Sequence, residues 1–152
     1  SNYPDLRKIQ YVDNPPNLYV GTHYLQSLYG QSVSTYLNTR HLKELKFKST
    51  TDLEIICIPP WQLDRFVGKL DLVHNGHSFV EMPSDVVANY AKLAEGILTD
   101  DGAVTLVSYS GGDQHTLNPV DLPDAFSREF EVRLQPTLYP NRQDHHFVAS
   151  AT

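Results

Sequence analysis

The sequence predicts an α/β fold with a mostly parallel sheet, helices on both faces in three layers, and an antiparallel hairpin at its end. Short β-branched or alternating runs alternate along the chain with longer segments whose apolar residues recur at helical spacing. Residues 53–58 are almost continuously apolar, which indicates a strand covered on both faces. Since consecutive parallel strands need crossover helices, this alternation favours β-α-β units within a single domain, residues 1–152.

Composition excludes several classes of protein. The 152 residues carry a formal net charge of −6, and 40% are hydrophobic, which suffices for a sizeable core. An acidic balance argues against nucleic acid as a partner, because phosphate contacts need clustered Lys and Arg. No apolar run approaches the roughly 20 residues that cross a bilayer, so no membrane partner is expected, and nothing resembles a signal peptide. With Cys57 as the single cysteine, we expect a reducing, cytoplasmic location.

The first half of the chain is expected to hold two strands and three helical segments. An alternating run, residues 7–13, ends on the acid Asp13, and Pro16 suits the first turn of a helix that ends before Gly30. A second helix is expected over residues 33–45, and residues 61–66 can form a short one after the strand at 53–58. The residues expected to face inward from the two longer helices are Leu18, Leu25, Leu28, Tyr29, Val33, Tyr36, Leu37 and Leu45.

The second half repeats the alternation. Residues 69–75 are expected to form a buried strand that opens into a polar loop at 74–83, and Ser84 is a candidate N-cap of a helix ending at Leu98. A turn at 99–102 leads into a strand at 103–109, with one helical turn near 122–127 and an antiparallel pair at 130–134 and 146–149. The apolar stripe of the helix is Val86, Val87, Tyr90, Leu93, Ala94, Ile97 and Leu98.

These segments resemble those of a known family. A strand at 70–73, the pattern Asn-x-x-Ser-Phe-x-Glu-Met from Asn75 to Met82, a helix, and Thr-Asp-Asp-Gly at 99–102 resemble Rossmann-like (class I) S-adenosylmethionine-dependent methyltransferases. The Asn75–Met82 pattern looks most like the sugar O-methyltransferase group. The runs at 13–16 and 56–60 and the terminal hairpin look like further parts of the same fold. The resemblance implies an S-adenosylmethionine-dependent O-methyltransferase that acts on a sugar or another small hydroxylated acceptor.

The sequence departs from this family in one respect. The family's Gly-x-Gly-x-Gly turn is absent, because only twelve residues precede Asp13, too few for a strand, that turn and a crossover helix. We therefore expect the C-terminal two-thirds of such a domain, lacking a central strand between the strand at 7–13 and the strand at 69–75. A fragment, a rearranged sheet that closes the gap, or a partner chain that supplies a strand would each explain this. Exposed strand edges also favour a homodimer.

Candidate cofactor-binding residues follow from where ligands bind in parallel sheets, at the carboxyl ends of the strands. The resemblance implies that Asp13 accepts the ribose hydroxyls of the cofactor, while an Asx turn before the prolines is the alternative. Ile58 and Pro59 are candidates for contact with the adenine. Trp61 could join them, although a role as a core anchor is favoured. Asn75 and Gly76 lie where the family's loop approaches the methionine part of the cofactor.

His77 and Glu81 are the candidate catalytic residues, because methyl transfer to a hydroxyl needs a base that takes its proton. A histidine titrates near neutrality and suits this task, whereas Glu81 could instead interact with the start of the next helix. His74 and His77 could hold a metal with Glu81, but His-x-x-His in a loop has no fixed geometry, and no metal is expected. The alternative to an enzyme is a non-catalytic or degenerate module that binds no cofactor, which the missing glycine turn favours.

Overall fold

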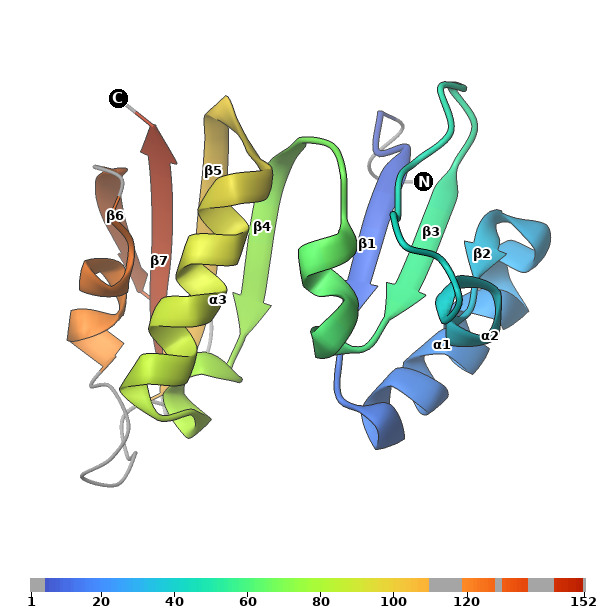
Figure 1. The fold of residues 1–152 in the computed structure, drawn as a ribbon. Coiled ribbons are helices and arrows are strands. Elements are labelled where there is room, and N and C mark those ends of the chain that lie inside the picture. Colours follow the sequence, from blue (N-terminus) through green and yellow to red (C-terminus); the bar gives the residue numbers. More distant parts are fainter. Residues whose placement is uncertain (1–4, 110–118, 128–129, 137–143, 152) are drawn as a thin grey trace. The chain divides into compact units, whose positions relative to one another are not determined.

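The computed structural model describes residues 5–109, 119–127, 130–136 and 144–151, with side chains described up to residue 108 and from 121 to 127. The chain forms two compact units, an N-terminal unit of residues 1–68 and a C-terminal unit of residues 69–152 (Figure 1). Each unit contains one sheet with helices packed on it, which confirms the predicted mixed α/β class.

A three-stranded parallel sheet in the order β1-β3-β2 forms the centre of the N-terminal unit. Strand β1 pairs with β3 along its whole length, from Lys8 opposite Glu54 to Val12 opposite Ile58. The elements of this unit are β1 (Lys8–Val12), α1 (Pro15–Tyr29), a 3₁₀ turn (Gly30–Ser32), β2 (Val33–Ser34), α2 (Tyr36–Thr39), β3 (Glu54–Ile58) and a second 3₁₀ turn (Pro60–Arg65).

Strand β3 carries the core of the N-terminal unit. Its four consecutive residues from Ile55 to Ile58 are all buried, so both faces of the strand are covered, as their unbroken apolarity predicted. On one face, Ile55 and Cys57 pack with Leu18 of α1 and Val33 of β2. Burial raises the pKa of the Cys57 thiol, which the Thr22 hydroxyl partly offsets by hydrogen bonding to the sulfur.

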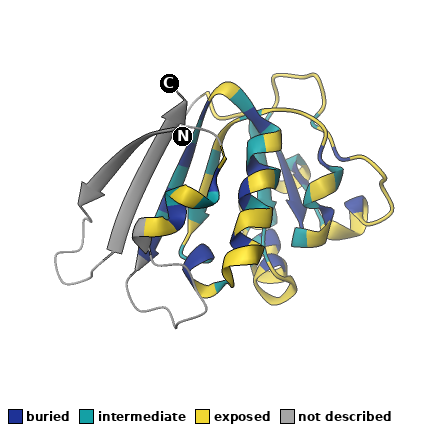
Figure 2. Cartoon of the chain, turned by 60° about the vertical axis from the view of Figure 1, so that its left-hand side comes forward, coloured by how far each residue is buried: buried dark blue, intermediate teal, exposed yellow. Residues whose placement is uncertain are grey.

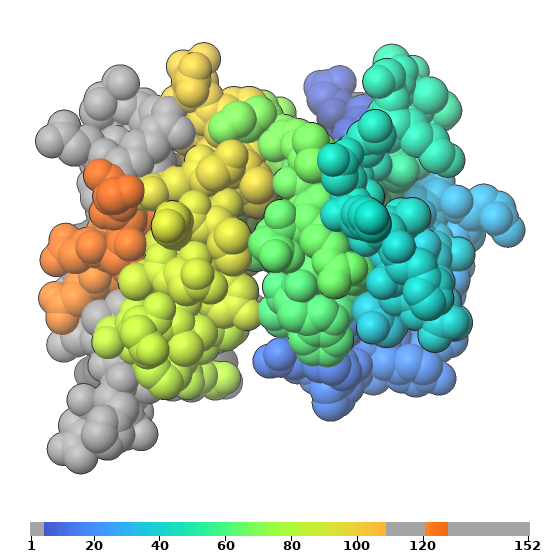
Figure 3. Space-filling view, viewed as in Figure 1, coloured from blue at the N-terminus to red at the C-terminus, as the bar shows by residue number. Residues whose placement is uncertain are grey.

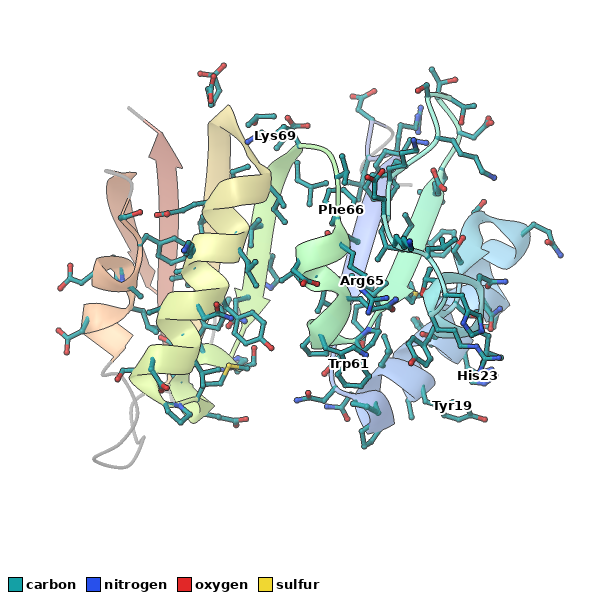
Figure 4. All side chains as sticks on the ribbon, in the orientation of Figure 1. Tyr19, His23, Trp61, Arg65, Phe66 and Lys69 are labelled. Atoms are coloured by element: carbon teal, nitrogen blue, oxygen red, sulfur yellow. The ribbon has the colours of Figure 1, made fainter. Side chains whose placement is uncertain are left out.

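Helix α1 begins and ends as the sequence indicated, with prolines in its first turn and Gly30 at a positive φ of 52° after its end. Its buried side is narrower than expected. Leu18 is buried and Leu25 packs against the core, but Leu28 and Tyr29 are exposed, so their predicted inward orientation was wrong. The outer side instead carries aromatic rings, including the edge-to-face pair of Tyr19 and His23, whose centroids lie 4.4 Å apart (Figure 4).

The single helix expected over residues 33–45 is not formed. Val33 pairs with Ile55 as part of a strand, and a capping box between Thr35 and Asn38 then starts the four-residue helix α2. Tyr36 and Leu37 are consequently exposed rather than inward-facing. Leu45 is buried as predicted, but through a parallel bridge to Phe66 instead of through a helix face.

The C-terminal unit contains a four-stranded sheet in the order β4-β5-β7-β6. Strands β4 and β5 are parallel, whereas β7 runs antiparallel to both of its neighbours, which confirms the predicted terminal hairpin. The elements are β4 (Leu70–Gly76), a 3₁₀ turn (Phe79–Glu81), α3 (Ser84–Ile97), β5 (Leu98–Tyr109), a further 3₁₀ segment (Pro119–Ala125), β6 (Phe130–Pro136) and β7 (Asp144–Ala151).

Helix α3 covers one face of this sheet (Figures 1 and 3). It buries Val87, Ala91 and Ala94 against Val104 and Leu106 of β5, while its outer side is exposed (Figure 2). Most of the predicted stripe is therefore confirmed, although Val86 is exposed. The helix begins at Ser84 itself, with Pro83 in the capping position and no side-chain hydrogen bond there, so the predicted Ser84 cap was wrong.

Strand β4 lies at the edge of its sheet and is not the buried strand that was predicted, since Asp71 and Leu72 are both exposed. The predicted turn at 99–102 lies within the long strand β5, where the register slips between Leu70 opposite Leu98 and Leu72 opposite Ala103. A Cβ atom at Gly102 would lie 2.8 Å from Leu98 Cδ2 and 3.0 Å from the Thr99 carbonyl oxygen, so this irregularity requires a glycine.

Strands β1 and β4 each end the order of their own sheet, and each hydrogen-bonds to a single neighbouring strand among the described residues. A central strand was expected between these two, and the described strands of each unit form a sheet of their own. None of the helices in the described part of the chain has the length and apolarity needed to span a membrane.

The packing of α1 can be tested with the same substitution at two positions of the helix. Leu18→Ala is expected to lower the free energy of unfolding by about 2–4 kcal/mol, because it leaves a cavity against β3. Leu28→Ala, on the exposed side, is expected to change it by less than about 1 kcal/mol. Urea unfolding followed by circular dichroism measures both values, and equal losses would contradict this orientation of α1.

Candidate functional site

The carboxyl edge of the N-terminal sheet brings three predicted site residues together. Strands β1 and β3 run parallel and end opposite each other, at Val12 and Ile58. One further bond, from the Asp13 backbone N–H to the Ile58 carbonyl oxygen at 3.4 Å, continues the ladder past the end of β1. Asp13, Ile58 and Pro59 therefore lie side by side at the edge where parallel sheets bind ligands.

The carboxylate of Asp13 is held by two neighbours. The Tyr11 hydroxyl donates to Oδ2 at 2.9 Å, and the Asn14 backbone N–H donates to Oδ1 at 2.7 Å. An ionised carboxylate can accept about four hydrogen bonds, two on each oxygen. Each oxygen of this half-buried carboxylate thus retains capacity for one more donor.

Asp13 also shapes the start of α1, but not through the Asx turn given as the alternative, because Pro15, two residues on, has no N–H to donate. Its bond to the Asn14 N–H fixes the chain just before the helix, and the Asn14 carbonyl oxygen accepts the first helical bond from Leu18 N at 2.7 Å. The two prolines that follow have no N–H to satisfy at this position. The local role and a ligand-binding role are compatible, because the local bonds use only one acceptor position on each oxygen.

Tyr11, which supplies one of the two donors to Asp13, was not among the predicted site residues. Strand periodicity could have identified it, because residues two apart on a strand point to the same face, as Tyr11 and Asp13 do. Burial, followed by the neighbouring Asp13 carboxylate, raises the pKa of the Tyr11 phenol to about 12. The hydroxyl therefore stays protonated at neutral pH and remains a donor.

The residues proposed to contact an adenine ring differ in exposure. Ile58 and Pro59 are fully buried, whereas Trp61, labelled in Figure 4, is 55% exposed. The Trp61 ring meets the Tyr36 ring edge-on, with centroids 6.4 Å apart. The favoured role of Trp61 as a core anchor was therefore wrong. Gln62 takes the buried place in this turn, where its amide nitrogen donates to the Thr39 carbonyl oxygen at 3.1 Å.

In the C-terminal unit, the end of β4 is held firmly to β5. Gly76 pairs with Val107, and the His77 backbone N–H donates to the Val107 carbonyl oxygen at 2.7 Å. The His74 Nδ1 atom lies 2.7 Å from the Thr105 hydroxyl of the neighbouring strand. The loop that was predicted to carry chemistry thus leaves the sheet from a fixed point.

Asn75 closes this loop with its side chain. Its amide nitrogen donates to the Ser78 hydroxyl at 2.6 Å, and its amide oxygen accepts the Phe79 backbone N–H at 3.1 Å. Phe79 and Val80 then enter the core under α3. Because both polar ends of Asn75 are engaged within the loop, its evident role is to fix the backbone that carries His77.

His77 has a backbone φ of 69°, a left-handed conformation that is uncommon for any residue other than glycine. Its side chain is half-buried, while Glu81 is exposed in the 3₁₀ turn that follows. An uncommon backbone conformation held by neighbouring bonds often occurs at functional sites. Among the residues that the structure describes, no three His, Cys, Asp or Glu side chains gather in a way that could hold a metal ion.

Comparison with solved structures shows that the chain has a methyltransferase-like fold. It is similar to an assigned rRNA methylase from Clostridium thermocellum, with a TM-score of 0.58 and 12% identity over 95% of this chain and 75% of that one. The pyocyanin biosynthetic protein PhzM gives the same TM-score and identity over 94% of this chain. The chain spans 42% of the length of PhzM. No family model matches the sequence. No curated protein matches it either.

The burial of Tyr11 implies a pH dependence of stability. The pKa of its phenol rises from 10.0 to about 12 on folding, so the unfolded chain loses this proton first. The contribution of Tyr11 to the free energy of unfolding is complete below pH 10 and decreases between about pH 10 and 12. In urea titrations across this range, Tyr11→Phe should show a shallower decrease than the wild type. An identical slope would contradict the contact.

The backbone conformation of His77 can be tested independently of its side chain. His77→Gly is expected to be more stable than His77→Ala by about 1 kcal/mol, because glycine adopts a positive φ without the steric cost that alanine meets. Ala88→Gly, on the exposed side of α3, is the control and should show the opposite preference by a similar amount. Thermal and urea unfolding provide the measurement. A more stable alanine at both positions would exclude the left-handed conformation.

Proposed function

We propose that this protein is an S-adenosylmethionine-dependent O-methyltransferase-like domain and that its methyl acceptor is a sugar or another small hydroxylated molecule. The observation that carries the proposal is the Asp13 carboxylate, held at the carboxyl edge of a parallel sheet with one open acceptor position on each oxygen. A similar fold in a protein assigned as an rRNA methylase supports the transfer of a methyl group as the reaction. The sugar acceptor rests on the sequence resemblance alone.

The residues of the N-terminal unit fit the nucleoside part of such a cofactor. Two neighbouring ribose hydroxyls need two acceptors close together, and a carboxylate provides them on one rigid group. Asp13 is half-buried, which limits competition from water without removing the carboxylate from reach. Ile58 and Pro59 would form the floor beneath the adenine, because both residues are fully buried, and the exposed Trp61 offers surface for the ring beside them.

The residues of the C-terminal unit fit the handling of the acceptor. When bound, the cofactor supplies an electrophilic methyl group on a sulfonium, so the protein needs mainly to orient the acceptor and remove its proton. We assign the His77 imidazole to accepting this proton, since histidine is the most frequent general base, and assign Glu81 to orienting or assisting it. Asn75 fixes the loop, and the sequence resemblance assigns Asn75 and Gly76 to the methionine part of the cofactor.

Calorimetric titration of the 152-residue chain with S-adenosylmethionine and S-adenosylhomocysteine tests the cofactor assignment. We expect one-site binding that Asp13→Ala weakens about tenfold or more, because two charge-assisted hydrogen bonds are lost. Asp64→Ala is the matched control, an exposed acid of the same unit, and should bind as the wild type does. Absence of binding by the folded wild type would instead support a non-catalytic module.

A further inference from the structure

We propose that Tyr11 is a positioning residue that holds the Asp13 carboxylate in the orientation that accepts two neighbouring hydroxyls, and that Gly21 leaves the space that the Tyr11 ring needs. This inference rests on the proposed binding of a nucleoside cofactor at Asp13. It assigns a role to one residue of β1 and one residue of α1, neither of which is proposed to contact the ligand.

The two donors to Asp13 define the orientation of its carboxylate. A carboxylate with a single partner can rotate about its last side-chain bond, because that torsion has a broad energy profile. Here the Asn14 N–H holds Oδ1 at 2.7 Å and the Tyr11 hydroxyl holds Oδ2 at 2.9 Å, so both oxygens are fixed. Removal of the Tyr11 hydroxyl would leave only the backbone donor and restore this rotation.

Gly21 explains how the Tyr11 ring reaches this position. A Cβ atom added at Gly21 would lie 2.7 Å from both Cε1 and Cζ of Tyr11 and closer still to its hydroxyl oxygen. The ring therefore passes directly against the backbone of α1. A helix with glycine in its interior is less stable than the same helix with alanine. The close approach of the Tyr11 ring explains why glycine occupies this position in α1. Any side chain at position 21 would displace the hydroxyl from Asp13.

The chemistry of the phenol suits this task. The phenol is protonated at neutral pH and can donate to the carboxylate, and the Asp13 oxygen at 2.9 Å lies closer to it than its other acceptor, the Asn17 carbonyl oxygen at 3.5 Å. The Tyr11 ring also packs against the core around Leu18 and Cys57. Packing by itself needs only the ring, because a phenylalanine would fill almost the same space. The hydroxyl is the part that the positioning role requires, and a substitution can remove it alone.

A measurement without ligand tests the contact itself. In protein labelled with ¹³C at the tyrosine Cζ, the resonance that disappears in Tyr11→Phe belongs to Tyr11, and its shift reports the hydrogen bond of the phenol. We expect Asp13→Ala to move this resonance, since the acceptor is lost, and Asp64→Ala to leave it in place. An unchanged Tyr11 resonance in Asp13→Ala overturns the proposal.

Titration with S-adenosylhomocysteine tests the consequence for ligand binding. We expect Tyr11→Phe to weaken binding about three- to tenfold, less than the loss of a hydrogen bond to a charged group, because the ligand keeps its own bonds to Asp13. Tyr24→Phe, the same change on the exposed side of α1, should leave affinity unaltered. In an Asp13→Ala background, Tyr11→Phe should have no further effect, because the two residues act as one unit. A purely structural role would weaken both backgrounds equally and overturn the proposal.

Substitution of the glycine tests the same role from the helix side. Gly21→Ala should weaken binding at least as much as Tyr11→Phe, whereas Gly96→Ala in α3, where an added Cβ meets no atom within 4 Å, should not. The ligand results also separate this inference from the proposed function. No binding by the wild type overturns both. Binding that Asp13→Ala weakens and Tyr11→Phe does not overturns only the role of Tyr11.

Discussion

The parallel pairing of β1 with β3 is the constraint on which the N-terminal unit depends. Because Val12 lies opposite Ile58, the two strands end together and Asp13 leaves the sheet beside Pro59. The same pairing makes β3 a central strand with both faces covered, and α1 packs on one of them through Leu18. A shift of one residue in this register would move Asp13 away from Pro59 and exchange Ile55 and Cys57 with Ile56 and Ile58 between the two covered faces of β3.

In both units, polar side chains near the strand ends make hydrogen bonds that fix the local backbone. Asp13 fixes the start of α1, and Asn75 closes the loop that leads to the core under α3. The two residues differ in how much hydrogen-bonding capacity remains for a ligand. Asn75 engages its amide nitrogen and its amide oxygen within the loop, whereas the Asp13 carboxylate has acceptor capacity beyond its two local bonds. Asp13 is therefore the better supported ligand-binding group, and Asn75 the support for the His77 backbone.

The edges of the two sheets are the clearest departure from a complete parallel α/β sheet. Strands β1 and β4 are end strands of separate sheets, although strands with their sequences are expected beside a central strand in the methyltransferase-like fold. The exposed Leu72 on β4 illustrates the consequence, since a leucine that would be covered in the middle of a sheet is exposed at its edge. The fold likeness nevertheless extends over 94% and 95% of this chain in two solved structures.

Outside residues 33–45, the sequence by itself determined the order of strands and helices, and it also determined the burial of β3, the apolar face of α3 and the terminal hairpin. These features depend on periodicity and on turn residues that act locally. It also selected Asp13, whose place after a strand could be recognised from the chain alone. Only the tertiary structure decided that Leu28 and Trp61 are exposed, that Val33 belongs to a strand and that Tyr11 holds Asp13. These outcomes depend on which neighbours cover each side chain, and many of those neighbours lie far away in the sequence. Gly21 is a further case, because the absence of its Cβ atom is what leaves space for the Tyr11 ring.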